Sequence, residues 1–308
     1  MSAPKVIGVD VGGTKILAGI IDADGNVLEK IQIPSPTSST EALLNGIDEV
    51  VTELLDAEIA AIGFGIPSSI DQRSGIVISS VNLPLQGMHF RQRMSERFDL
   101  PVGMDNDANV AAIGEWKAGV GRGTNDLVML TLGTGVGGGL ILGGKPYRGY
   151  AGAGGELGHM VILHDGPPCY GNCNGHGHLE AFASGHAAAL AARKQLGPDF
   201  DSRKLVEHGK AGDELALELL HWIGECLGSA LGSLVNIFNP ELIIIGGGFA
   251  AAGELILAPA RERMLKESLP GLVGLTRMVV AELGSDAGMI GAGFVAFEAL
   301  EIVPAATQ

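Results

Sequence analysis

The chain has 308 residues, of which 46% are hydrophobic and 18% charged, so it is a globular chain and not a disordered one. Its formal net charge of −15 argues against a broad nucleic-acid-binding surface, and we expect no nucleic-acid partner. Glycine is abundant, with 48 residues and no Gly-X-Y period, which excludes collagen and indicates tight turns whose backbone approaches a ligand.

The chain shows no signs of export or membrane insertion. Asp10 ends the first apolar run too early for a signal peptide. No uncharged apolar stretch reaches the roughly 18 residues of a membrane span, so no membrane partner is expected. The three cysteines, Cys169, Cys173 and Cys226, are an odd number, which argues against a disulfide framework and favours a cytoplasmic protein. Cys226 lies in an apolar helical stretch and is expected in the core.

The first third of the chain predicts a mixed α/β arrangement. Apolar runs and turn residues predict three antiparallel strands, a helix that Thr40 can cap, and a parallel strand. These elements cover Lys5–Asp10, Ile16–Asp22, Val27–Ile33, the helical apolar positions from Leu43 to Leu55, and Ile59–Gly65.

The second half repeats the opening hairpin. Val128–Leu142 reads as strand, glycine turn and strand, and so mirrors Val6–Ile21. Later segments predict helices near Leu179–Leu196 and Asp213–Phe238, a strand at Leu242–Ile245 and a helix near Asp286–Leu300. With a boundary near Gly114–Asp126, we expect a small domain over residues 1–114 and a larger one over 115–289. The last helix, about 290–308, is expected to pack back onto the small domain.

The first glycine turn joins two strands and carries several polar groups, namely Asp10, Gly12, Gly13, Thr14 and Lys15. Backbone N–H groups of such a turn can converge on a phosphate because no Cβ blocks the approach. Thr14 adds a hydroxyl, Lys15 a cation, and Asp10 an oxygen ligand suited to Mg²⁺. The run is not a P-loop, because Lys and Thr stand in the reverse order and a strand follows in place of a helix.

Two further glycine clusters occur in the second half, Gly133, Thr134 and Gly135, and Gly246, Gly247 and Gly248. The first matches G-x-G-x-x-G, but no helix follows, which argues against a nicotinamide oxidoreductase. Each turn alone could be purely structural. Two such hairpins facing each other would instead grip the β- and γ-phosphates of one nucleotide, and the third cluster suits its nucleoside.

The motifs DVGGTK, LGTGVGGG and GGG, in this order, resemble the sugar-kinase, actin and Hsp70 fold. The stretches Gly154–His159 and Leu179–Gly185 are similar to the ROK family (repressors, open reading frames and kinases), and within it to the bacterial glucokinases. The resemblance covers about Ile7 to Phe297. It implies a two-domain actin/hexokinase/Hsp70-like fold, a duplicated ribonuclease H-like α/β fold with its active site in the cleft between domains.

The resemblance also implies an ATP-dependent hexose kinase of glycolysis, which passes the γ-phosphoryl group to the 6-hydroxyl of glucose with Mg²⁺ bridging the phosphates. Such a transfer needs a carboxylate that accepts the proton of the attacking hydroxyl. The family's Asn-Asp-Ala motif gives this role to Asp107 and a sugar hydroxyl to Asn106. From the residues alone, both side chains could equally cap the alanine-rich helix that follows them.

The remaining sugar contacts come from the resemblance as well. Gly65, Pro67, Ser68 and Asn82 lie in stretches that resemble loops lining the sugar pocket, and Asn106 and Asp107 face the same sugar. Glu156, His159 and Glu180 resemble the residues that bind hydroxyls near the anomeric carbon. Ser68 departs from a glycine common in the family, which puts its own contact in doubt.

A further cluster has the residue types of a structural zinc site, namely His159, Cys169, Cys173 and His178. The family has three cysteines after the histidine. Here two extra residues separate the cysteines, and His178 stands where a Cys is expected. His176 is a competing ligand and His164 a weaker one. The zinc is expected to hold His159 and Glu180 in place for the sugar.

Several alternatives stay open or are disfavoured. A ROK transcriptional repressor would carry a helix-turn-helix segment before Val6, where only about five residues stand. A kinase for N-acetylmannosamine, N-acetylglucosamine or fructose is a nearer alternative, as is a polyphosphate donor, which Lys15 alone does not settle. Small-molecule sugar and nucleotide are the expected partners, and family analogy suggests a homodimer or homotetramer.

Overall fold

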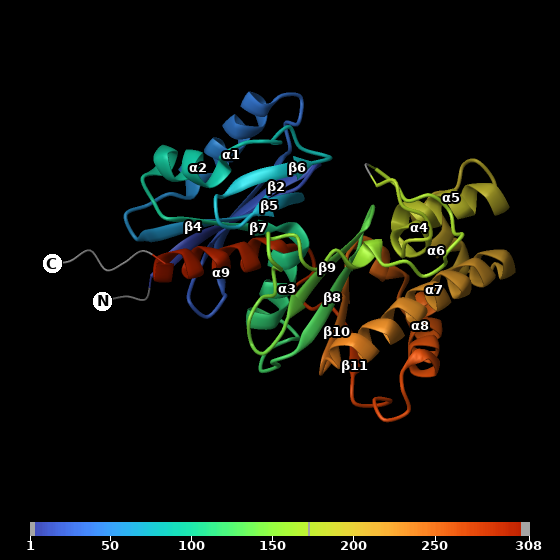
Figure 1. Ribbon diagram of the computed structural model, residues 1–308. Coiled ribbons are helices and arrows are strands. Elements are labelled where there is room, and N and C mark those ends of the chain that lie inside the picture. Colours follow the sequence, from blue (N-terminus) through green and yellow to red (C-terminus); the bar gives the residue numbers. More distant parts are fainter. Residues whose placement is uncertain (1–3, 172, 303–308) are drawn as a thin grey trace.

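The computed structural model of the protein describes residues 4–171 and 173–302 (Figure 1). The strands are β1 Lys5–Val11, β2 Lys15–Ile21, β3 Val27–Pro34, β4 Ile59–Ile66, β5 Ser68–Asp71, β6 Ile76–Ser80, β7 Val102–Asn106, β8 Leu127–Leu132, β9 Val136–Ile141, β10 Leu242–Gly246 and β11 Arg277–Val280. The α-helices are α1 Thr40–Leu54, α2 Phe90–Phe98, α3 Asp107–Ala118, α4 Glu180–Ala183, α5 Gly185–Gln195, α6 Ser202–Lys210, α7 Glu214–Phe238, α8 Glu254–Glu267 and α9 Ala287–Ile302. Residues 303–308 of the predicted last helix lie outside the described residues.

The first sheet has the strand order β3-β2-β1-β4-β7. The two hairpin connections pair β1, β2 and β3 antiparallel, whereas β4 and β7 run parallel to β1. Asp10 on β1 pairs with Gly65 on β4, and Ile66 pairs with Asn106 on β7. Because parallel strands end at the same edge of a sheet, the register brings three predicted site positions to one edge.

The second sheet has the order β11-β10-β8-β9, in which β9 is antiparallel to β8 while β10 and β11 are parallel to it. The predicted hairpins β1–β2 and β8–β9 thus stand in the same relation to a following parallel strand, β4 in one sheet and β10 in the other. Gly246 pairs with Thr131, so the second and third glycine clusters follow neighbouring strands.

Two helices lie between the sheets (Figure 1). One face of the first sheet is covered by α1 and α2, and its other face by α9. Helix α3 packs on α9 and on β8 and β9, while α4 to α8 cover the far side of the second sheet. The molecule is therefore layered, and the helix that begins at Asp107 reaches both sheets.

Small residues allow the close approach of these layers. A Cβ at Gly63 on β4 would overlap the carbonyl oxygen of Ala292 on α9, and one at Gly291 would overlap the carbonyl oxygen of Val110 on α3. Glycine at these positions lets backbone pack directly on backbone.

The structure corrects three predictions. Ser39, not Thr40, caps α1, because the Ser39 hydroxyl accepts the Ala42 N–H at 3.1 Å, while Thr40 donates to the carbonyl of Pro84. The predicted helix Leu179–Leu196 is two helices, because the extended backbone at Ser184 ends α4 and its hydroxyl caps α5. Cys226 is only partly buried on α7 and not a core residue. Within the described residues, no helix is long and apolar enough to cross a membrane.

Candidate active site

The start of α3 places Asp107 where the two sheets come together. Asn106 is the N-cap residue, and its Oδ1 accepts the N–H of Ala108 at 2.9 Å and that of Asn109 at 3.4 Å. The capping alternative therefore holds for the side chain of Asn106, which also donates to the carbonyl of Ser68 at 3.4 Å. Asp107 is not the N-cap residue of this helix, so its carboxylate is available for a role in catalysis. Poor hydration, and then the nearby Glu156, raises the pKa of Asp107, although the helix N–H groups oppose the shift.

The first glycine turn lies beside this carboxylate. Burial first, and then the charge of Asp107, raises the pKa of Asp10 to about 6, with Lys15 acting in the opposite direction. Gly12 donates to the carbonyl of Lys15 at 2.9 Å, which closes the turn, and leaves Gly13 and Thr14 exposed. The carboxylate of Asp10 offers the oxygen ligand that a divalent cation such as Mg²⁺ prefers.

The second and third glycine clusters lie side by side in the other sheet. Gly133 donates to the carbonyl of Gly135 at 2.9 Å, and Thr134 is exposed at the tip. Gly247 adopts a φ of +85° against the end of β8, where a Cβ would overlap the carbonyl of Leu132. A Cβ at Gly248, by contrast, would meet open space. Bare backbone therefore faces outward at both clusters, as phosphate or nucleoside binding requires.

The predicted sugar residues are spread over both sheets. Ser68 is buried, and its hydroxyl donates to the Ser80 hydroxyl at 2.8 Å, so this side chain serves the β5–β6 hairpin. Gly65 is buried against Val110 of α3. Pro67 is half-buried just after β4, and Asn82 is exposed beside the Gly12-Gly13 turn.

Glu156, near enough to Asp107 to affect its pKa, is exposed and precedes the short helix Leu157–His159. Glu180 begins α4, and its Oε2 accepts the N–H of Val136 at 2.8 Å. A Cβ at Gly135 would overlap that carboxylate, so the glycine makes room for it. The Gly133–Gly135 turn, a candidate phosphate site, is thus in direct contact with Glu180, a candidate sugar ligand.

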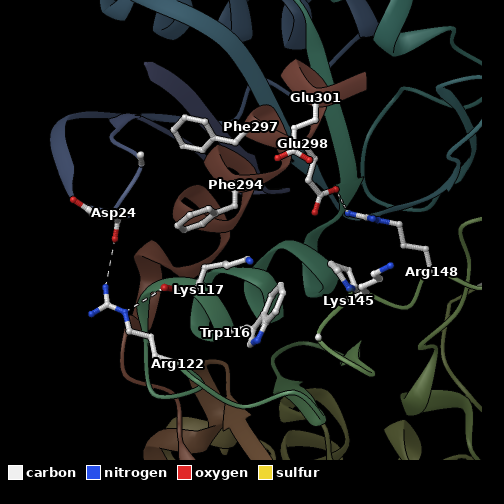
Figure 2. Close-up of a pocket in the computed structure, with 13 residues that line it drawn as sticks. Asp24, Trp116, Lys117, Arg122, Lys145, Arg148, Phe294, Phe297, Glu298 and Glu301 are labelled. Atoms are coloured by element: carbon white, nitrogen blue, oxygen red, sulfur yellow. Dashed lines mark hydrogen bonds and ion pairs between the residues drawn. The ribbon is translucent and has the colours of Figure 1, made fainter. Parts of the chain in front are cut away.

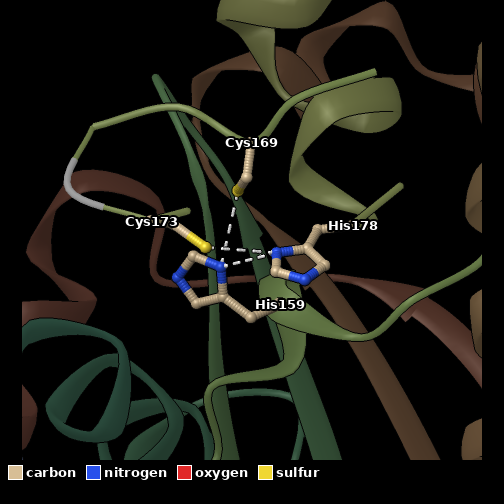
Figure 3. Close-up of side chains that lie close together, drawn as sticks. All are labelled: His159, Cys169, Cys173 and His178. Carbon is tan, nitrogen blue, oxygen red and sulfur yellow. Dashed lines mark hydrogen bonds between the residues drawn. The ribbon is translucent and has the colours of Figure 1, made fainter. Parts of the chain in front are cut away.

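Four predicted metal ligands converge in one cluster, His159, Cys169, Cys173 and His178 (Figure 3). Their ligand atoms all lie within 4.8 Å of one another. The Nδ1 atoms of His159 and His178 are 3.3 Å apart, Cys169 Sγ is 3.5 Å from His159 Nδ1, and Cys173 Sγ is 3.4 Å from His178 Nδ1. His176 and His164 are exposed and do not belong to this group.

These separations fit a tetrahedral ion. Metal–nitrogen bonds of about 2.0 Å and metal–sulfur bonds of about 2.3 Å, typical of zinc, place tetrahedral ligand atoms about 3.3 to 3.8 Å apart. Burial and the neighbouring Cys173 raise the pKa of Cys169 to about 11. Bound zinc would reverse that shift, because a coordinating thiol is deprotonated. His159 would use Nδ1 for the metal and keep Nε2 for a sugar hydroxyl.

Sequence reasoning missed one group of charged side chains near Asp107. Asp105 is fully buried, and it forms an ion pair with Arg148, which also pairs with Glu298 on α9 (Figure 2). Arg148 and Glu298 line a pocket of about 850 Å³ that holds none of the predicted site residues. The partners are 43 and 150 positions apart in sequence, and no local motif signals their pairing.

Comparisons with known proteins agree with this geometry. The ROK family model matches residues 6–299. A glucokinase of Thermotoga maritima is 36% identical, with the alignment covering 94% of this chain and 96% of that protein. The structure is similar to a ROK family glucokinase from Streptomyces griseus in complex with glucose and AMPPNP, at 31% identity and a TM-score of 0.82 over 96% of this chain and 99% of that one. It is also similar to a ROK hexokinase from Thermus thermophilus, at 35% identity and a TM-score of 0.83 with the same coverage.

The layered two-sheet architecture is thus the two-domain actin/hexokinase-like fold that the sequence motifs predicted. Both the family match and the solved structures extend over nearly the whole chain, from the first strand to the last helix. On these grounds the chain belongs to the ROK family.

Proposed function

We propose that the protein is an ATP-dependent hexose kinase that transfers the γ-phosphoryl group of ATP to the 6-hydroxyl of glucose. The observation that carries the proposal is the poorly hydrated carboxylate of Asp107 at the start of α3. Asp107 is not the N-cap residue of this helix, and it lies next to Asp10 and Glu156. The glucokinase relatives, at 33–36% identity, support glucose as the sugar, and the similar glucokinase solved with glucose and AMPPNP supports ATP as the donor.

In this mechanism Asp107 accepts the proton of the attacking 6-hydroxyl. Its raised pKa makes it a stronger base than an ordinary aspartate. Phosphoryl transfer needs little further covalent chemistry from the protein, so positioning and charge stabilisation supply most of the rate. The remaining residues act by holding the two substrates in line.

The glycine turns would hold the nucleotide. Exposed N–H groups at Gly13 and Thr14, with the Lys15 ammonium, face one side of the phosphates, and the turn at Gly133, Thr134 and Gly135 faces the other. The loop of Gly246, Gly247 and Gly248 carries the nucleoside. Asp10 would hold a magnesium ion, which would supply positive charge to offset that of the phosphates.

The sugar would contact Glu156, His159 Nε2 and Glu180 near its anomeric carbon and Asn106 near the reacting end. Buried polar groups that pair with particular hydroxyls discriminate between sugars more sharply than apolar contacts do. A structural zinc at the Cys/His cluster would fix His159 and lie next to Glu180, whose Oε1 is 3.9 Å from Cys169 Sγ. Zinc bound there would therefore affect sugar affinity by fixing His159.

The domain division remains part of the proposal, with residues 1–114 and the last helix forming the small domain and 115–289 the large one. Its support is that α9 packs on the first sheet although it follows the second in sequence. The cytoplasmic location and a homodimeric or homotetrameric state likewise stay predictions.

A coupled assay of the purified protein tests the function. Glucose 6-phosphate is measured with glucose and either Mg-ATP or polyphosphate as donor. We expect turnover with ATP, and with polyphosphate less than a tenth of that rate. Activity with polyphosphate alone would overturn the donor, and no glucose 6-phosphate with either donor would overturn the function.

A further inference from the structure

The carboxylate of Asp105 lies two residues before the proposed base. It is fully buried, yet each of its oxygens has a partner. Oδ1 accepts the N–H of Asn106 at 2.8 Å and the side-chain amide of Asn109 at 2.9 Å. Oδ2 accepts Nε of Arg148 at 2.5 Å. A carboxylate can be buried at tolerable cost only when its charge and its lone pairs are satisfied in this way.

Arg148 belongs to a different part of the molecule, the segment after β9. Its guanidinium divides its donors between two elements. Nε donates to Asp105 of β7, and Nη2 donates to Glu298 of α9 at 2.8 Å; Figure 2 shows the contact with Glu298. The planar fork of arginine suits this double contact, which a lysine ammonium could not reproduce with the same geometry.

The backbone of Arg148 contacts the segment that leads to Glu156 on the other side of the proposed site. Gly154 donates its N–H to the carbonyl oxygen of Arg148 at 2.9 Å, which closes the turn that leads into Gly155 and Glu156. Arg148 therefore has contacts that lead to both sides of the reacting centre. Its side chain reaches the start of α3 through Asp105, and its carbonyl fixes the approach of Glu156.

We propose that Arg148 is a positioning residue for phosphoryl transfer, acting through Asp105 on the carboxylate of Asp107. The inference rests on the proposed role of Asp107 as base. Asp105 accepts hydrogen bonds from the N–H of Asn106 and the side-chain amide of Asn109, which flank Asp107 in sequence. The position of the Asp107 backbone therefore depends on the position of Asp105. Misplacement of a catalytic group by about 1 Å can cost about a hundredfold in rate.

The test compares Arg148→Met with a matched control, Arg73→Met. Arg73 contacts the same segment but not Asp105. Its Nη2 donates to the carbonyl oxygen of Tyr150 at 2.9 Å, and its guanidinium carbon lies 4.4 Å from the centroid of the Tyr150 ring. We expect Arg148→Met to lower kcat about ten- to a hundredfold while KM for ATP changes less than about threefold. Arg73→Met should keep kcat within about twofold of the wild type.

Two further variants separate positioning from charge compensation. Arg148→Lys keeps the charge without the fork and should recover only part of the lost kcat. Asp105→Asn combined with Arg148→Met removes the unpaired buried charge, so it should restore the melting temperature but leave kcat low. A return of kcat to the wild-type value in this double variant would overturn the inference, even if Arg148→Met alone does not fold.

The wild-type enzyme distinguishes the two proposals. If it phosphorylates glucose and Arg148→Met does so with kcat within threefold, the positioning role is wrong and the function stands. If the wild type phosphorylates no sugar, the function fails, and the positioning role fails with it.

Discussion

The carboxylate of Asp107 stands at a helix N-terminus, yet a neighbouring side chain does the capping. Asn106 takes the first N–H groups of α3, so Asp107 can be changed without removing the cap. We therefore predict that Asp107→Asn lowers kcat by several powers of ten while glucose and ATP still bind, because positioning survives and proton acceptance is lost. Steady-state kinetics and calorimetric binding of both substrates measure the two effects.

Asp201→Asn is the matched control for Asp107→Asn. Asp201 caps α6 by accepting the Lys204 N–H at 2.8 Å, and Asn caps helices as well as Asp does. This variant should keep wild-type kcat. Near-normal turnover of a folded Asp107→Asn enzyme would contradict the assignment of the base.

Asp10 predicts a pH dependence of stability. Its pKa is raised from 3.8 to about 6, first by burial and then by Asp107, so the folded protein binds this proton more tightly than the unfolded chain does. The stabilising contribution is full below about pH 4 and is lost as the pH rises through about 6. We expect Asp10→Asn to raise the stability of the metal-free protein by about 1 to 3 kcal/mol at pH 8 and to change it little at pH 4, as denaturant unfolding would measure.

Asp22 provides a control of opposite sign. The Asn26 side chain and then several backbone N–H groups lower the pKa of Asp22, so its contribution is present above about pH 4 and is lost in acid. Asp22→Asn should therefore destabilise the protein at pH 8. If Asp10→Asn is destabilising at pH 8 in the absence of magnesium, the charge of Asp10 is compensated in a way that the structure does not show.

For single residues, the sequence could indicate a functional role only where the residue stands in a local motif. The turn Asp10–Lys15 and the pair Asn106-Asp107 carry their signal within a few positions. Asp105, Arg148 and Glu298 carry none, because their chemistry arises from a contact between segments far apart in the chain. Ser68 shows the same limit, since its hydroxyl proved to be engaged by Ser80.

At the scale of elements, prediction succeeded where periodicity and turn residues agreed. Both glycine hairpins, α1 and α7 lie where the sequence placed them, with shifts of a residue or two at their ends. The division at Ser184 was missed because the apolar pattern continues across it, whereas a single capping hydroxyl ends one helix and starts the next.

The Cys/His loop predicts a metal dependence. We expect about one zinc per chain by elemental analysis, and we expect Cys173→Ser and His178→Ala to lose it, because each removes one of four converging ligand atoms. Glucose affinity should fall together with zinc content, since His159 would supply a metal ligand and a sugar contact from the same ring.

His176→Ala is the matched control for the metal site. His176 is exposed two positions away and lies outside the cluster, so its loss should leave both zinc content and glucose affinity unchanged. If His176→Ala and not His178→Ala releases the metal, the ligand set is wrong. Carefully purified protein without any zinc would refute the site as a whole.

At the scale of the whole molecule, the proposed site is assembled where the layers meet. Asp10, Asn106 and Asp107 lie at the edge of one sheet. The Gly133 turn lies at the edge of the other, where Glu180 at the start of α4 contacts β9, and α3 reaches both sheets. The order of the motifs predicted the fold by resemblance, but no local pattern predicts which edges face each other. That arrangement depends on glycine contacts such as Gly63 against α9, which are visible only in three dimensions.

Sugar specificity belongs to this scale because the sugar contacts come from both sheets. The proposed sugar contacts indicate a hexose without saying which one; they are Asn106, Asp107, Glu156, His159 and Glu180. An N-acetyl group would need a pocket beside C2 of the sugar and a polar partner for its amide; without them, exclusion and unpaired polar groups should cost several kcal/mol. We therefore predict that kcat/KM for glucose exceeds that for N-acetylglucosamine and N-acetylmannosamine by roughly a hundredfold or more. Measurement of kcat/KM for these three sugars with mannose and fructose, at one ATP concentration, decides the substrate. A higher value for either N-acetyl sugar would replace glucose and leave the kinase chemistry of Asp107 in place.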